Sequence, residues 1–360
     1  PAMALKSNRL DNIQVLRAIA ALMVCAFHLQ YLFMSPGDEK PFPNGEMGVQ
    51  VFFIISGLIM YHTTRNEQGI PQKSAWSFAY NRIIRIVPLY VLVSLVYVAD
   101  DISWQYLNEN FARIVKTVFF IPQMTDTVGP KYGYPLLDVG WTLNYEMFFY
   151  FIFFVSLLFG RLAYRILLSM FLIFGVLIPL IFIGGFDPAY ASFKDYPISI
   201  FNMFCNPMVL LFASGVLLGM LMDRIEWGKI VLVSGFIVST MFFIMHVTGM
   251  LGLQVNIYTD FLFIFPWIFF VAMCDKAGMF VFQIRRLTSV GDASYSLYLW
   301  HPIVFAYLRL IAERLSLPYM DFPWISFIIG MVAAAVVAHI SYVQIESRVT
   351  PWLKSKWSVK

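Results

Sequence analysis

Long apolar stretches separated by short polar segments dominate this chain of 360 residues. A helix needs roughly 20 mostly apolar residues to cross the hydrocarbon core of a bilayer. Ten stretches meet that requirement and predict about ten membrane-spanning helices. The predicted spans are 11–34, 46–65, 83–100, 141–160, 163–184, 201–222, 229–248, 257–274, 294–315 and 323–345. A shorter apolar run at 112–122 predicts an interfacial or re-entrant helix instead.

The composition also favours an all-α, polytopic membrane protein. Apolar residues make up 60% of the chain and charged residues 13%, whereas a soluble domain is nearer half apolar and a quarter charged. So little charge cannot cover a water-facing surface of this size, which argues against a soluble enzyme, a disordered protein or a nucleic-acid-binding domain. The three cysteines lie in apolar runs without metal-ligand spacing, so they indicate neither a disulfide framework nor a metal site.

The positions of the basic residues predict the orientation of the chain. An even number of spans places both termini on one side of the membrane. With the termini in the cytoplasm, most of the 25 Lys and Arg residues fall on cytoplasmic segments, as the positive-inside rule requires. We therefore expect one membrane domain at 11–345, with cytoplasmic tails at 1–10 and 346–360.

Ionisable residues inside the predicted spans are costly in lipid and are candidates for function. Arg17 and His28 are eleven residues apart in the first span, so they share one helix face, about 16 Å apart along the axis. The structural alternatives are a snorkelling anchor for Arg17 and a core imidazole bonded to a nearby carbonyl for His28. Glu146 lies in the fourth span at the depth expected for His28, and a buried carboxylate needs a partner. Because a carboxylate beside an imidazole orients a general base, we predict that Glu146 contacts His28. The alternative is that Glu146 pairs with Arg17 and has a purely structural role.

Two further groups of polar residues mark candidate binding surfaces. Arg82 and Arg85 are three residues apart at the start of the third span and therefore share a face at its cytoplasmic mouth. Paired guanidinium groups suit phosphate, although basic residues also flank membrane spans in general. Ser294, Tyr298 and His301 form a polar stripe in the ninth span, of the kind that faces a cavity or a partner helix.

Five segments carry sequence motifs in a fixed order along the chain. They are LRAIAALMVCAFH (16–28), GEMGVQVFFIISGLI (45–59), NRIIRIVPLY (81–90), WTLNYEMFFY (141–150) and GDASYSLYLWHPIV (291–304). Together they resemble the acyltransferase-3 family of bacterial inner-membrane O-acyltransferases, and especially its exopolysaccharide-acetylating members. Thr142 stands where the family usually has Ser, and Ile55 where Val is common.

The resemblance implies an enzyme of the bacterial inner membrane that moves an acyl group, with acetyl expected, from cytoplasmic acyl-CoA to a sugar hydroxyl of an exopolysaccharide or other cell-envelope glycan. It assigns catalysis to His28, Glu146 and Arg17, with His28 as general base and an acyl-histidine intermediate as an open alternative. Donor binding falls to Arg82, Arg85, Ser56, Tyr298 and His301. No metal and no nucleic acid are expected. The expected partners are a glycan or lipid-linked oligosaccharide and membrane lipid, and a homo-oligomer is left open.

A polytopic transporter or flippase for a lipid-linked saccharide is the alternative from another functional class. Arg17, Glu146 and His28 would then form a proton or substrate relay. That alternative gives no role to the Arg82 and Arg85 pair or to the five ordered motifs. CoA binding separates the two functions, because a flippase has no need of it.

Overall fold

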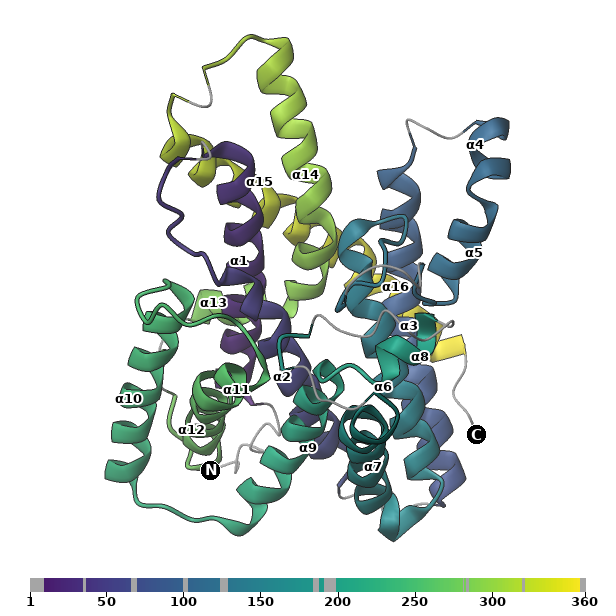
Figure 1. The fold of residues 1–360 in the computed structure, drawn as a ribbon, viewed down its shortest axis with the longest axis vertical. Coiled ribbons are helices and arrows are strands. Elements are labelled where there is room, and N and C mark those ends of the chain that lie inside the picture. Colours follow the sequence, from purple (N-terminus) through teal and green to yellow (C-terminus); the bar gives the residue numbers. More distant parts are fainter. Residues whose placement is uncertain are drawn as a thin grey trace, which may run out of the picture.

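The computed structural model describes residues 10–34, 37–65, 70–99, 103–123, 129–183, 188–190, 199–280, 282, 285–318 and 321–356. All regular secondary structure within those ranges is helical, and no β-strand occurs there (Figure 1). The predicted all-α class is confirmed.

The longer helices follow the predicted spans. They are α1 (Asp11–Phe33), α2 (Gly48–Thr64), α3 (Pro71–Tyr97), α6 (Trp141–Leu157), α7 (Ala163–Leu172), α9 (Met208–Arg224), α10 (Lys229–Val247), α12 (Phe265–Lys276), α14 (Ser294–Arg314) and α15 (Pro323–Ser341). The shorter helices are α4 (Trp104–Glu109), α5 (Phe111–Val118), α8 (Ser199–Phe204), α11 (Ile257–Thr259), α13 (Arg285–Asp292) and α16 (Ser347–Lys356). Short π-helical segments extend α7 and α15 and precede α12.

Eight helical segments of the described chain are long and apolar enough to cross a membrane. The predicted spans at 141–160 and 294–315 are not among these eight, although both form helices. α6 has only 17 residues, and α14 carries His301 and three charged residues among its 21. The count of ten spans and the cytoplasmic location of the termini therefore stay predictions.

The chain ends differ in detail from the predicted tails. α15 continues through the π segment η7 (Tyr342–Glu346) into α16, so the tail predicted at 346–360 is helical as far as Lys356. α16 packs against α3, where the Tyr80 hydroxyl donates to the Leu353 carbonyl at 2.7 Å. Only Leu10 of the predicted N-terminal tail lies within the described residues.

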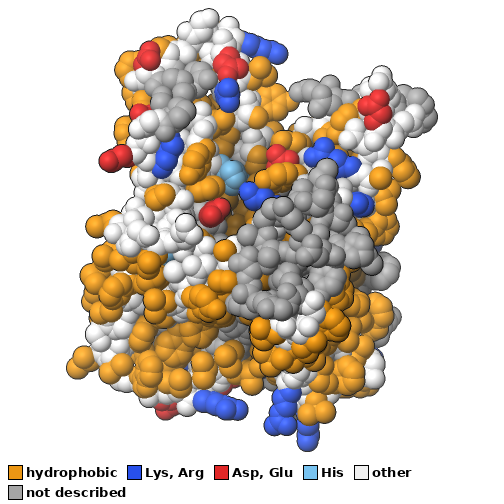
Figure 2. Space-filling model, in the orientation of Figure 1, with side chains coloured by type: hydrophobic (Ala, Val, Ile, Leu, Met, Phe, Trp, Pro, Cys, Tyr) orange, Lys and Arg blue, Asp and Glu red, His pale blue; other side chains and the backbone are white. Residues whose placement is uncertain are grey.

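α1 is the central helix of the fold. It contacts α2, α12, α13, α14 and α15, and the upper parts of α14 and α15 stand beside it in Figure 1, across from α4 and α5. Hydrophobic side chains cover most of the lower part of the face in Figure 2, with Lys and Arg at its lower edge. This distribution is typical of a lipid-facing body with a basic flank.

α2 and α9 pack closely through glycines. A Cβ atom on Gly57 of α2 would collide with the Phe212 carbonyl oxygen, and one on Gly215 of α9 would collide with the Ile54 carbonyl oxygen. Small residues that let two helix backbones approach are a common means of helix association in membranes. The close crossing fixes α2, whose Ser56 precedes Gly57 on the side of the candidate site.

α6 divides into an aromatic face and a polar face. On the aromatic face, Phe149 stacks on Phe212 of α9 with ring centroids 4.4 Å apart. Thr142, Glu146 and Tyr150 follow at four-residue spacing, which places all three on the polar face. Aromatic packing therefore sets the direction in which these three side chains point.

Candidate active site

A narrow pocket of about 80 Å³ lies between α1, α2, α3, α6 and α14. It brings together six of the eight predicted site residues from five distant segments: Arg17, Ser56, Arg82, Arg85, Glu146 and Tyr298. The other two, His28 and His301, lie outside its lining. The five motifs thus converge on one place in the fold.

Arg17 is held in the pocket wall by neutral partners. Its guanidinium donates to Gln14 Oε1 at 3.0 Å and to Ser294 Oγ at 2.9 Å, and the residue is 9% exposed. These contacts pin the side chain between α1 and α14, which argues against the snorkelling alternative. The positive charge is kept inside the protein, where it acts over a longer range than in water.

Arg82 and Arg85 both reach the same pocket from α3. The Arg82 guanidinium lies over the rings of Phe78 and Tyr150, 5.5 and 5.6 Å from their centroids. Among the described residues, no carboxylate lies within ion-pair distance of either arginine. Planar guanidinium groups without a paired carboxylate are suited to an anionic ligand such as phosphate.

Glu146 faces these arginines instead of His28. It accepts a hydrogen bond from the Tyr150 hydroxyl, one turn further along α6, and interacts electrostatically with Arg17 and Arg82. The predicted contact between Glu146 and His28 is absent from the described structure. Equal depth in two helices did not imply contact, because the aromatic packing of α6 turns its polar face toward α3.

His28 and His301 form a pair at the end of the α14 stripe. Nε2 of His301 lies 3.3 Å from Nδ1 of His28. Each Nδ1 also lies close to the carbonyl oxygen four residues earlier, at 2.9 Å for Val24 and 3.2 Å for Leu297. A carbonyl only accepts, so each neutral ring carries its proton on Nδ1 and His28 Nε2 keeps a free lone pair. A backbone bond was the structural alternative for His28; it forms at Nδ1 and leaves Nε2 available as a base.

Tyr298 links the pocket to this histidine pair. Its hydroxyl lies 2.8 Å from Thr142 Oγ1 and donates to the Val139 carbonyl at 3.0 Å. Its ring centroid is 5.9 Å from that of His301, which is fully buried. The His28 ring is exposed, and histidine atoms are visible in the hollow at the centre of the face in Figure 2. Tyr298 therefore lies between the arginine pocket and the histidine pair.

Sequence reasoning missed Glu346, which it placed in the C-terminal tail. Its Oε1 accepts from Ser296 Oγ at 2.6 Å, and it interacts electrostatically with Arg85 and Arg17. The continuation of α15 through η7 carries this carboxylate back to the site. The sequence contained one signal for this residue: Glu346 is the single acidic residue in the otherwise uncharged run YVQIE.

A family model that describes an acyltransferase domain matches residues 10–343. The chain belongs to the acyltransferase-3 family. The family predicted from the five motifs is thereby confirmed, and the converging residues described above come from those motifs.

Curated relatives are similar over most of this chain. The exopolysaccharide production protein ExoZ of Rhizobium meliloti is 28% identical over 265 residues, which cover 72% of this chain and 76% of ExoZ. The O-acetyltransferase OatA of Staphylococcus aureus is 25% identical, over 94% of this chain and 57% of OatA. The peptidoglycan O-acetyltransferase OatA of Listeria monocytogenes is 23% identical, over 81% of this chain and 49% of OatA. The chain thus spans about half the length of the OatA proteins. No solved structure matches it.

Proposed function

We propose that the protein transfers an acetyl group from cytoplasmic acyl-CoA to a hydroxyl group of a cell-envelope polysaccharide. One observation carries this proposal: Tyr298, in the wall of an arginine-lined pocket, lies against a histidine pair in which Nε2 of His28 is the unprotonated nitrogen. The names of the relatives supply the acceptor class, since ExoZ serves exopolysaccharide production and OatA of Listeria acetylates peptidoglycan.

The charge of the pocket supports acyl-CoA as the donor. Arg82 and Arg85 are proposed to bind its phosphates through charge-assisted, bidentate hydrogen bonds. An open volume of about 80 Å³ leaves room for a thin chain such as the pantetheine arm. Ser56 and Tyr298 would line the path of that arm toward the histidine pair.

His28 is the proposed general base of the transfer step. The acceptor hydroxyl gives its proton to His28 Nε2 while its oxygen bonds to the thioester carbonyl carbon. The carbon–sulfur bond then breaks, and the CoA thiolate takes the proton from the imidazolium. The Nδ1 proton, shared between the Val24 carbonyl and His301 Nε2, holds the ring in the tautomer that this step needs.

The proposal places the arginine end of the site at the cytoplasmic face of a bacterial inner membrane. The positive-inside distribution of Lys and Arg supports that orientation. The donor then enters from the cytoplasm, and His28 lies toward the outer face, where an envelope polysaccharide is accessible.

Purified protein in detergent tests the proposal with radiolabelled acetyl-CoA and an exopolysaccharide acceptor. We expect CoA to bind in calorimetry and label to appear in alkali-labile esters of the acceptor. CoA binding that is lost in the Arg82→Ala, Arg85→Ala double variant would support the assigned donor site. A protein that moves a lipid-linked saccharide across vesicles but binds no CoA would be a flippase, and the proposal would be wrong.

A further inference from the structure

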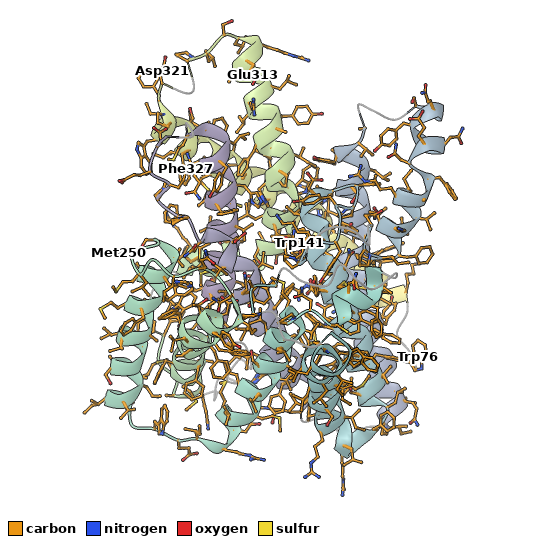
Figure 3. The ribbon with its side chains drawn as sticks, in the orientation of Figure 1. Trp76, Trp141, Met250, Glu313, Asp321 and Phe327 are labelled. Carbon is orange, nitrogen blue, oxygen red and sulfur yellow. The ribbon has the colours of Figure 1, made fainter. Side chains whose placement is uncertain are left out.

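A second pocket lies back to back with the arginine pocket. It has an open volume of about 240 Å³ and is lined from the starts of α2 and α6 and from the segments around 130 and 190. Val49 lines both pockets, whereas the neighbours Trp141 and Thr142 line one each. Trp141 lies near the centre of the molecule in Figure 3, well away from Trp76 at its edge. The first turns of α2 and α6 therefore separate two cavities.

Gln50, in the wall of this second pocket, has a buried hydrogen-bond acceptor without a partner. The residue is 4% exposed, and within the described part of the chain its Oε1 has no hydrogen-bond partner. A buried polar atom without a partner is destabilising, and leucine would fill the same space without that penalty. Once the Gln50 amide turns into the pocket, a bound ligand that donates a hydrogen bond would supply the missing partner.

The other lining residues have mixed chemistry. Trp141 contributes an aromatic ring, and Glu46 and Lys131 contribute opposite charges. Lys131 interacts electrostatically with Glu46 on one side and with His28 on the other. The pocket therefore lies close to the proposed base and combines an apolar surface with donors and acceptors.

A sugar ring matches this combination. Its hydroxyl groups both donate and accept hydrogen bonds, and its C–H face is apolar. The open volume of about 240 Å³ is many times the roughly 10–15 Å³ that one water molecule requires, so the pocket has room for a ligand much larger than water, such as one monosaccharide unit.

We propose that this second pocket binds one sugar residue of the acceptor and presents its hydroxyl group to His28. The inference rests on the proposed function and adds a place for the acceptor. Donor and acceptor then approach the histidine pair from opposite sides of the first turns of α2 and α6, so both can be bound at the moment of transfer.

Thiol labelling tests sugar binding without requiring catalysis. Ala189 is exposed and lines the second pocket, and all three natural cysteines are buried. Methyl glycosides of glucose, galactose and N-acetylglucosamine are the probes. A glycoside at about three times its Kd should slow maleimide labelling of Ala189→Cys about fourfold by mass action. CoA should not slow it, and Ala277→Cys, exposed at the end of α12, should be unaffected by either ligand.

Kinetics test the roles of the lining residues. Gln50→Leu and Trp141→Leu should each raise the KM for the glycoside about tenfold, as expected for one lost polar or aromatic contact. The KM for acetyl-CoA should stay within about twofold, because neither residue lines the donor pocket. Trp76→Leu is the matched control, since Trp76 is 62% exposed and lies at the edge of the molecule (Figure 3).

The outcomes separate this inference from the proposed function. Protection of Ala189→Cys by glycosides without any acetyl transfer would support the sugar site and contradict the transferase proposal. Transfer to glycosides with no protection of Ala189→Cys would support the transferase and overturn the sugar site. A raised acetyl-CoA KM in Gln50→Leu or Trp141→Leu would also overturn it.

Discussion

The protonation pattern of two imidazole rings decides what the site can do. His301 is fully buried, and its Nδ1–H donates a hydrogen bond to the Leu297 carbonyl. Its Nε2 therefore carries no proton and accepts a hydrogen bond from Nδ1 of His28. His28 has the same bond to Val24 but an exposed ring. His301 therefore orients the His28 ring, and His28 has a basic nitrogen that a substrate can reach.

His28→Ala should abolish transfer without affecting the fold or CoA binding. The expected loss in kcat is about 100- to 10,000-fold, the usual contribution of a general base. The measurement is acetyl transfer per folded molecule, with CoA affinity by calorimetry alongside. His339→Ala is the control, because His339 is an exposed histidine on α15. Transfer near the parent rate in well-folded His28→Ala would remove His28 from the mechanism.

Glu146→Gln should change the affinity for CoA more than it changes kcat. The carboxylate faces Arg17 and Arg82, so its loss raises the net positive charge of the pocket. We expect tighter CoA binding at low ionic strength and a steeper loss of affinity as salt is added, because screening weakens that added attraction. The measurement is CoA affinity across a salt series, with Glu313→Gln at an exposed ion pair as control.

The same variant tests the role first predicted for Glu146. An orienting partner of His28 would slow the chemical step by about a hundredfold and leave CoA binding unchanged. A kcat close to that of the parent, together with altered salt dependence, would support the position seen in the structure.

At the level of helices, the sequence predicted how far along its helix axis each site residue lies. It did not predict which neighbouring helix each side chain faces. Counting residues gave the depth of Arg17, His28 and Glu146 and the shared face of Arg82 and Arg85. Which helix each face meets depends on packing between distant segments, such as Phe149 of α6 on Phe212 of α9. For that reason the contact of His28 with His301 was not predicted. Glu346 was missed because the end of a helix is poorly defined by composition.

Arg82→Ala should weaken CoA binding at the start of α3. Loss of a hydrogen bond to a charged group costs about 1.5–3 kcal/mol, or roughly tenfold or more in Kd. The weakening should be greatest at low salt, where the attraction that Arg82 supplies is least screened, and the affinity of the variant should fall less steeply as salt is added. Arg82→Lys should recover only part of the affinity, since an ammonium lacks the planar fork. Calorimetry with CoA measures both, and Arg286→Ala, an exposed arginine on α13, is the control. If all variants bound CoA with equal affinity, Arg82 would be an ordinary basic residue that flanks a membrane span.

Gly57→Ala and Gly215→Ala should separate α2 from α9. Each added methyl meets a backbone carbonyl of the opposite helix, and overpacking of this kind costs about 1–3 kcal/mol. A lower melting temperature in detergent is the expected result, with a loss of transfer that follows the displacement of Ser56. Gly228→Ala is the control, because nothing lies within 4 Å of its added Cβ. Unchanged stability in both variants would show that α2 and α9 tolerate a wider spacing.

At the scale of the whole molecule, the site explains why two of the ten predicted spans look unlike membrane helices. α6 and α14 turn Glu146, Tyr298 and His301 inward, where polar side chains avoid lipid. The 21 residues of α14 extend about 31 Å, and the 17 of α6 about 25 Å before its flanking turns are added. Both lengths are close to the roughly 30 Å hydrocarbon core, so we predict that both helices cross the membrane with these polar side chains turned inward.

Cysteine accessibility in intact cells distinguishes ten spans from eight. The location of the termini cannot do so, since either even number leaves both on one side. If α6 crosses, Glu109→Cys before it should react with a membrane-impermeant maleimide, whereas Arg161→Cys after it should react only once the cells are permeabilised. If α14 crosses, Glu313→Cys at its end should react in intact cells and Arg286→Cys before it should not. All four positions are exposed in the structure, so a lack of labelling reports the membrane and not burial. Labelling of Arg161→Cys in intact cells would show that α6 does not cross, and the cytoplasmic assignment of the arginine end would then have to be revised.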